Sequence, residues 1–307
     1  FEGNATLIGN TTLVGPSAKL AGTFDGQEHD LTINYTSPTT ISSSGGNITN
    51  FTSVGDVLLK TPAFETIGTQ TFQGTVTLTG DTMLTGTSGS FASGLDGANH
   101  SLTLNYFNTT TISGNSVFSD LNDLTSHGPV ELGGTIQTAG NQSYLGTATL
   151  IGATEIKAAG GSFEGGLVGA GNDPTLNIAN TITIEDGSGV NNLTSIGDTV
   201  LTGTINTTGS QTYQSNVTIE GDVIINAGGE VVFEADVIGD DEIIYSSWAT
   251  QVGGTDTDSG ESIAVLADGS SIVTGIFQGT ATFGSTTLTS AGSDDVFVAK
   301  LDASGVD

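Results

Sequence analysis

The 307-residue chain carries 33 acidic and only four basic side chains, a formal net charge of −29, and 35% of its residues are hydrophobic. Nucleic acids and anionic membrane surfaces are bound by clustered lysine and arginine, so we expect neither as a partner. The chain has no run of 18 apolar residues, which argues against membrane insertion, and it has no cysteine from which a disulfide could form.

The composition favours an all-β protein. Forty-six residues are glycine and 6% are aromatic, and threonine, serine and asparagine are abundant, as in short strands joined by many turns. No segment shows a sustained apolar pattern at helical spacing.

One phrase recurs along the chain. It is read at Gly68–Leu78 (GTQTFQGTVTL), Gly140–Leu150 (GNQSYLGTATL) and Gly209–Ile219 (GSQTYQSNVTI), and the sequence opens within it at Phe1–Leu7. The aromatic positions are separated by 71, 72 and 69 residues and are Phe1, Phe72, Tyr144 and Tyr213. We therefore expect stacked repeat units at about 1–67, 68–139, 140–208 and 209–238. Because the chain begins inside a unit and without methionine, we expect a matured protein or a segment of a longer one.

Within the units, apolar and polar residues alternate. In the first unit Leu31, Ile33 and Tyr35 alternate with polar neighbours, a period of two that places the apolar side chains on one face of a strand. Equivalent apolar residues in the next units are Leu102, Leu104, Tyr106, Leu176 and Ile178.

Three glycines also occupy equivalent positions, at Gly55, Gly128 and Gly197. Glycine tolerates a positive φ angle, so we expect them to be turn residues of that kind.

A unit of about 70 residues fits about three coils of a β-solenoid with 20 to 25 residues each. One small antiparallel sandwich per unit is the alternative. The absence of linkers and the even strand spacing favour the solenoid. Its register places Phe72, Val76 and Leu78 inside and the threonines outside, and predicts an aromatic stack along the core.

The repeated pattern G-x-Q-[TS]-[FY]-x-x-x-[VA]-T-[LI] and the phrase GSFASGLDGANHSLTLN (Gly89–Asn105) resemble the repeat arrays of bacterial filamentous-haemagglutinin-like and autotransporter-like adhesins. The resemblance covers residues 1 to about 235. It implies a right-handed parallel β-helix that is exposed on the cell surface or released from it.

The pattern is lost around residues 228–241, and we place a domain boundary there, with a solenoid over 1–238 and a second module over 239–307. Segments Trp248–Gly254, Asp268–Phe277 and Asp295–Asp302 resemble one SBBP repeat, a bacterial propeller-type family. The resemblance implies a small antiparallel β module. A propeller needs about four to eight blades, so either the parent chain continues, or this module caps the solenoid or pairs with another subunit.

The chain holds eleven N-x-S/T sequons, which are candidates for glycosylation. Asparagine also serves turns and side-chain ladders without any glycan. The eleven residues are Asn4, Asn10, Asn34, Asn47, Asn50, Asn99, Asn108, Asn141, Asn192, Asn206 and Asn216.

Calcium is the one cofactor that the sequence suggests. Asp256 and Asp258, with Glu261 nearby, offer oxygen ligands on one side of an extended loop. Asp294 and Asp295 form a second acidic pair. The alternative is that all of these are solvated turn carboxylates, because neither group matches the EF-hand loop and the G-G-x-G-x-D nonapeptide of calcium-binding β-rolls is absent.

We expect no enzymatic activity. The acidic residues are scattered through turns, arginine is absent, and the three histidines, at 29, 100 and 127, lie in different units. His29 and His100 occupy equivalent positions, which favours a structural role in turns. A carbohydrate-active β-helix enzyme, a polysaccharide lyase or hydrolase with paired carboxylates, is the alternative function.

The function that the sequence favours is a bacterial extracellular or cell-surface structural protein, an adhesin or the repeating subunit of a filament. Exposed strand edges at the ends of a solenoid favour self-association end to end or by strand pairing. Surface glycans or other cells are the further partners expected of an adhesin.

Overall fold

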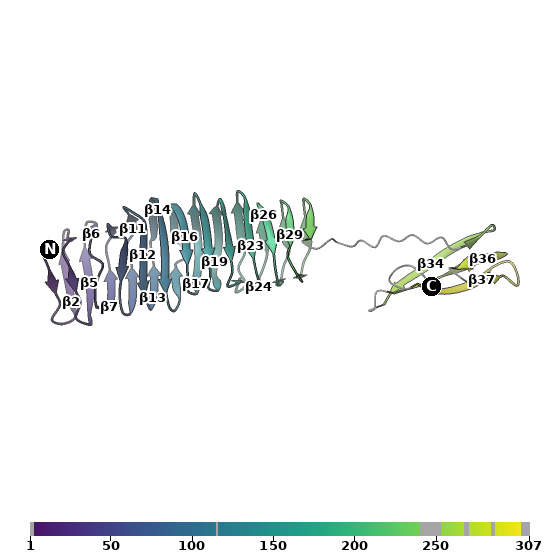
Figure 1. Cartoon of the computed structure of the whole chain (residues 1–307), viewed down its shortest axis with the longest axis horizontal. Helices are drawn as coiled ribbons and strands as arrows, with labels where there is room; N and C mark the ends of the chain where they lie inside the picture. Colours follow the sequence, from purple (N-terminus) through teal and green to yellow (C-terminus); the bar gives the residue numbers. More distant parts are fainter. Residues whose placement is uncertain (1–2, 115, 240–252, 267–269, 284–285, 302–307) are drawn as a thin grey trace. The chain divides into compact units, whose positions relative to one another are not determined.

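A computed structural model describes residues 3–114, 116–239, 253–266, 270–283 and 286–301 (Figure 1). The chain divides into two compact units, residues 1–241 and 242–307. The fold is all-β, with 63% of residues in strands and no helix in the described part. The first unit is a parallel β-solenoid of about 12 coils, and the second consists of small antiparallel sheets.

A typical coil of the solenoid contributes three short strands, one to each of three faces, and these strands pair in parallel with their equivalents in the neighbouring coils. On face 3, no strand lies between β4 and β9. Some long strands turn a corner and supply two faces.

Face 1 is formed by β2 (Thr11–Gly15), β5 (His29–Tyr35), β7 (Ile48–Ser53), β10 (Thr69–Phe72), β13 (Ser88–Phe91), β15 (Thr110–Ile112), the first parts of β17 (Val130–Thr138) and β19 (Ala148–Ala158), β21 (Leu167–Val168), β24 (Gly187–Val190), β27 (Thr204–Thr207) and β30 (Ile224–Ala227).

Face 2 is formed by β3 (Lys19–Leu20), β6 (Thr39–Ile41), β8 (Val57–Leu59), β11 (Val76–Leu78), the first parts of β14 (Gly94–Tyr106) and β16 (Val117–Ser126), the second parts of β17 and β19, β22 (Pro174–Ile178), β25 (Leu193–Ser195), β28 (Gln211–Tyr213) and β31 (Val231–Phe233).

Face 3 is formed by β1 (Ala5–Thr6), β4 (Phe24–Asp25), β9 (Ala63–Glu65), β12 (Thr82–Gly86), the second parts of β14 and β16, β18 (Asn141–Tyr144), β20 (Gly160–Phe163), β23 (Thr181–Ile184), β26 (Asp198–Leu201), β29 (Val217–Ile219) and β32 (Val237–Gly239).

The predicted solenoid is therefore confirmed and the antiparallel sandwich is wrong for these repeats. A coil takes about 20 residues: Thr11 pairs with Leu31, and Leu31 pairs with Phe51. Parallel stacking gives most inner strands two hydrogen-bonding partners, and 30 strands form one sheet, whereas β1 and β4 pair separately at the start of face 3.

The sequence repeat and the coil do not have the same length. The repeated phrase lies on face 1 at β10, on face 3 at β18 and on face 2 at β28. One unit spans three and two-thirds coils rather than the expected three, so each successive unit is turned by one face around the solenoid axis. Equivalent residues of the three units consequently point in three different directions.

This rotation corrects the single aromatic stack that the sequence suggested. Phe72 stacks on Phe91 with ring centroids 5.1 Å apart, whereas Tyr144 stacks on Phe163 at 5.0 Å. Tyr213 makes the same kind of contact on the remaining face, with Phe233. Phe72 also contacts Phe51, with ring centroids 5.7 Å apart, so it belongs to a local stack, whereas Tyr144 and Tyr213 each form a pair on their own face.

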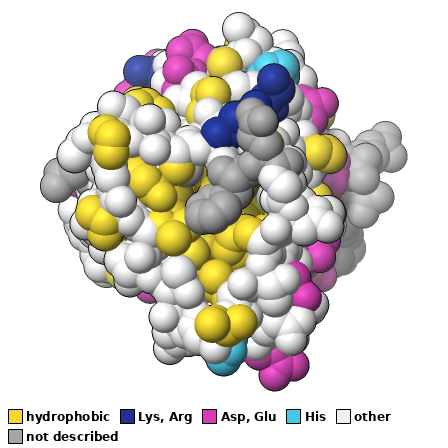
Figure 2. All heavy atoms as spheres, turned by 90° about the vertical axis from the view of Figure 1, so that its left-hand side faces the viewer, with side chains coloured by type: hydrophobic (Ala, Val, Ile, Leu, Met, Phe, Trp, Pro, Cys, Tyr) yellow, Lys and Arg dark blue, Asp and Glu magenta, His cyan; other side chains and the backbone are white. Residues whose placement is uncertain are grey.

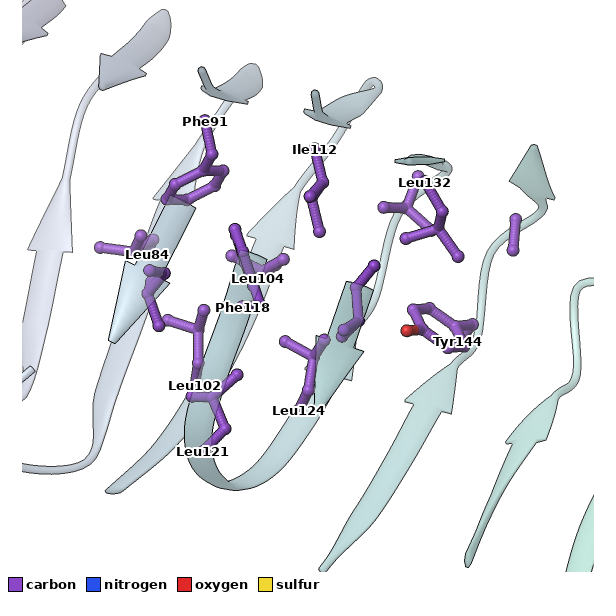
Figure 3. Close-up of a cluster of buried hydrophobic side chains, with 14 of the residues drawn as sticks. Leu84, Phe91, Leu102, Leu104, Ile112, Phe118, Leu121, Leu124, Leu132 and Tyr144 are labelled. Carbon is purple, nitrogen blue, oxygen red and sulfur yellow. The ribbon is translucent and has the colours of Figure 1, made fainter. Parts of the chain in front are cut away.

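The alternation of apolar and polar residues builds the core as predicted. Phe72 and Val76 are 0% exposed and Leu78 is 1% exposed. Figure 3 shows the interior between neighbouring coils, where Leu102 and Leu104 from β14 meet Leu124 from β16. The threonines between such residues lie on the outer surface, so the core is a continuous column of apolar side chains.

A buried glutamine in each repeated phrase braces a corner of the core. Gln142 is 1% exposed, and its Nε2 donates to the backbone oxygens of Ile136 (3.0 Å) and Lys157 (2.9 Å). The Tyr144 hydroxyl donates to Gln142 Oε1 at 2.7 Å. All polar atoms of the buried amide are therefore engaged, as burial requires.

The other two phrases form the same brace. Gln211 receives its hydroxyl donor from Tyr213, at 2.8 Å. The first phrase has Phe72 instead of tyrosine, and there Tyr106, from another strand, donates to Gln70 Oε1 at 2.7 Å. This role was not predicted from the sequence, although the glutamine recurs in all three copies of the phrase, as Gln70, Gln142 and Gln211.

The expected positive φ angle at Gly55, Gly128 and Gly197 is wrong. None of the three is among the glycines with positive φ. A Cβ atom at Gly128 would overlap the backbone oxygen of Tyr106 in the preceding coil, and Gly55 and Gly197 face carbonyl oxygens in the same way. These positions need glycine because two backbones approach closely.

The second unit has two three-stranded antiparallel sheets. They are formed by β33 (Gly253–Gly254), β36 (Thr280–Phe283) and β37 (Thr286–Thr289), and by β34 (Asp258–Val265), β35 (Ser271–Phe277) and β38 (Asp295–Leu301). Its hydrophobic cluster consists of Phe277, Ala281, Phe283 and Phe297.

Candidate functional site

Among the shallow hollows on the described surface of the solenoid, three are lined mainly by hydroxyl, amide and small side chains. The first, on face 1, has a volume of about 330 Å³. Its lining includes Thr69, Thr71, Ser88, Ser90, Thr109 and Thr111. Glu131 stands at its edge, where Glu131 Oε2 accepts a hydrogen bond from the Thr111 hydroxyl at 2.8 Å.

The second and third hollows flank one corner of the solenoid, between faces 2 and 3. The alanine hollow, of about 340 Å³, includes Gln137, Ala139, Lys157, Ala159, Asn177 and Ala179. The serine hollow, of about 360 Å³, includes Asn141, Ser143, Gly160, Ser162, Asn180 and Thr181. Ala159 lines one hollow and its neighbour Gly160 lines the other, so the two are adjacent.

The serine hollow and the face 1 hollow are equivalent in the repeat. Ser143 follows Thr71 by 72 residues, and Ser162 follows Ser90 by the same number. The rotation of the units places one copy on face 1 and the other on face 3. The repeat therefore presents the same kind of surface in two directions.

Lys157 is one of only four cationic side chains in the chain. Its Nζ lies 2.9 Å from Glu155 Oε2, and both side chains are partly exposed. The backbone of Lys157 is fixed from the core side, because its carbonyl oxygen accepts a hydrogen bond from the Gln142 side-chain amide. The alanine hollow is thus close to neutral and is built on a braced strand.

Nine of the eleven sequon asparagines are exposed, and Asn50 and Asn206 are half-buried. Several side chains are already engaged in bonds between coils. Asn50 Oδ1 accepts the Thr69 backbone N–H at 2.9 Å, and Asn192 Oδ1 accepts that of Ser210 at 2.9 Å. By contrast, five make no side-chain hydrogen bond to any described residue: Asn34, Asn99, Asn108, Asn141 and Asn216.

Such bonds form ladders at the corners. Asn10 Oδ1 accepts the Asp30 backbone N–H at 3.0 Å, and Asp30 Oδ1 accepts that of Asn50 at 3.2 Å. With the Asn50 to Thr69 bond, the ladder links four successive coils. Some of the sequon asparagines therefore have a structural role, since asparagine can satisfy the backbone of the next coil.

The residues predicted to bind calcium are not brought together. Asp258 Oδ2 accepts the backbone N–H of Gly254 at 2.7 Å, whereas Glu261 Oε1 accepts the Ser259 hydroxyl at 3.0 Å. In the second acidic pair, Asp295 Oδ2 accepts the Ala291 backbone N–H at 2.6 Å. No group of three or more His, Cys, Asp or Glu side chains in the described residues could hold a metal ion. Calcium binding stays a prediction.

The equivalent histidines follow equivalent turns. The residues before His29, Gln27 and Glu28, have positive φ angles of 47° and 61°. Those before His100, Ala98 and Asn99, have values of 47° and 66°. The His29 backbone N–H closes its turn onto the Gly26 oxygen at 2.9 Å.

No protein-family model matches the chain, and searches of curated proteins and of solved structures find no match either. The part of the chain that the structure describes contains no helix long and apolar enough to cross a membrane.

Proposed function

We propose that the chain is an extracellular or cell-surface structural protein whose solenoid serves as a stiff adhesive rod. The observation that carries the proposal is the 30-stranded parallel sheet that winds through the solenoid, braced inside by buried glutamines and at the corners by side-chain ladders. The resemblance of the repeats to bacterial surface adhesins supports the same function. So does a strongly acidic chain without cysteine.

The lining of the hollows supports a binding rather than a catalytic role. Most glycoside hydrolases use two carboxyl groups on either side of the scissile bond. Among the residues that line the three hollows, Glu131 is the one acid, and its Oε2 is engaged by Thr111.

We also propose that solenoids associate end to end. Strands β30, β31 and β32 each pair on one side only within the described residues. This coil exposes large apolar side chains, among them Ile224 at 55% and Ile238 at 49%. Figure 2 looks onto the N-terminal end, where hydrophobic side chains are visible inside a polar rim. Parallel strand pairing could join such ends head to tail.

Electron microscopy of the purified full chain tests both proposals. At about 4.8 Å per coil, a solenoid of about 12 coils should be a rod about 55–60 Å long. Filaments several times longer than this would support end-to-end association. Separate rods at high protein concentration would contradict association, and particles without a rod would contradict the structural function itself.

A further inference from the structure

The alanine and serine hollows lie side by side at the corner between faces 2 and 3. On face 2 the exposed amides of Gln137 and Asn177 stand on either side of Lys157. Across the corner, the alanine hollow gives way to the hydroxyl and amide groups of the serine hollow. We call these two adjacent hollows the corner groove.

The corner groove has the chemistry of a carbohydrate site. Amide and hydroxyl groups both donate and accept hydrogen bonds, as do the hydroxyls of a sugar. The methyl groups of Ala139, Ala159 and Ala179 offer an apolar floor for the C–H face of a pyranose ring. Ligand sites commonly combine such apolar contact with a few converging polar groups.

Charge selects among carbohydrate ligands. The chain has a net charge of −29, which repels acidic polysaccharides at moderate ionic strength. The cation in the groove, Lys157, is already paired with Glu155. We therefore propose that the corner groove binds a neutral polysaccharide chain. This inference rests on the proposed adhesive function and gives it a ligand class.

The preceding repeat contains a natural comparison for this proposal. The positions equivalent to Ala139, Ala159 and Ala179 are Ile67, Thr87 and Phe107, each 72 residues earlier. Ile67 is 55% exposed and Phe107 is 85% exposed, so bulky side chains project where the alanine hollow lies open. The earlier corner has the equivalent of the serine hollow, but two of the three alanine positions beside it carry these bulky side chains.

Exchange of these residues tests the groove. The full chain would be incubated with insoluble cellulose, chitin and mannan, and the protein left in solution after sedimentation would be measured. We expect retention by at least one polymer. The double variant Ala139→Ile/Ala179→Phe, which copies the earlier corner, should weaken retention at least tenfold. The reverse variant Ile67→Ala/Phe107→Ala should retain binding and increase the amount bound per chain.

Circular dichroism and electron microscopy of each variant would establish that it keeps its fold. Unchanged retention of the correctly folded Ala139→Ile/Ala179→Phe variant would overturn the proposal that the corner groove binds a polysaccharide. Failure of all three polymers to retain the wild-type chain would overturn it as well. Either result leaves the rod-like structural function in place. Release of soluble sugar would instead contradict the proposed non-catalytic function.

Discussion

Removal of the Tyr106 hydroxyl should destabilise the solenoid, because it leaves a buried amide oxygen without its donor. Tyr106 is 2% exposed and Gln70 is 0% exposed, and the hydroxyl donates to Gln70 Oε1 at 2.7 Å. An unsatisfied buried polar group costs about 1–3 kcal/mol. For a unit of this size, each kcal/mol lowers the melting temperature by roughly 2–4 °C, so Tyr106→Phe should melt roughly 2–12 °C lower.

The repeat supplies a rescue for this variant. Tyr144 and Tyr213 lie two residues after their glutamines and satisfy them directly, whereas Phe72 occupies that position beside Gln70. Phe72→Tyr should therefore restore the stability of Tyr106→Phe by placing a hydroxyl at Gln70 Oε1.

Thermal and urea unfolding, followed by far-ultraviolet circular dichroism, would measure both variants. The matched control is Tyr144→Phe, which should be destabilised to a similar extent but not rescued by Phe72→Tyr, because its glutamine lies in another unit. Failure of Phe72→Tyr to restore the single variant, with Tyr144→Phe behaving as expected, would refute the equivalence of the three braces.

Three further predictions follow from the same geometry. Burial raises the pKa of the three tyrosines that contact the glutamines above the ordinary value. The stability that they contribute is then fully present below about pH 10, and the free energy of unfolding falls above that pH by about 4 kcal/mol per pH unit. Urea unfolding at pH 9 to 11.5 would measure this fall, and a free energy of unfolding that does not change with pH would contradict it. Gly128→Ala should lower the melting temperature by several degrees, since its Cβ would overlap the Tyr106 oxygen, and an unchanged melting temperature would show that the coils can separate there. Asn50→Ala should destabilise the fold by about 1 kcal/mol, because it removes the hydrogen bond to the Thr69 backbone. Asn34→Ala, at a sequon without such a bond, should leave the stability unchanged. Equal effects of the two variants in urea unfolding would count against the corner ladder.

The candidate site could be predicted only in part. The sequence identified the sequons, and the structure then separated those in corner ladders, such as Asn50, from free ones such as Asn34. The corner groove could not be foreseen, because Gln137, Lys157 and Asn177 lie about 20 residues apart. They lie side by side on neighbouring strands because one coil also takes about 20 residues. The acidic residues Asp258 and Glu261 are close in sequence but accept hydrogen bonds from different partners, the Gly254 backbone N–H and the Ser259 hydroxyl.

The sequence by itself determined the all-β class, the parallel solenoid and the inward positions of residues such as Phe72 and Val76. These follow from local alternation and from repetition, both of which can be read without long-range contacts. The tertiary structure decided on which face of the solenoid each repeat unit places its equivalent residues. Coils of about 20 residues do not divide a 72-residue unit evenly, so equivalent side chains appear on different faces. It also decided that Gln70 pairs with Tyr106, 36 residues away, since only the folded core brings the two together.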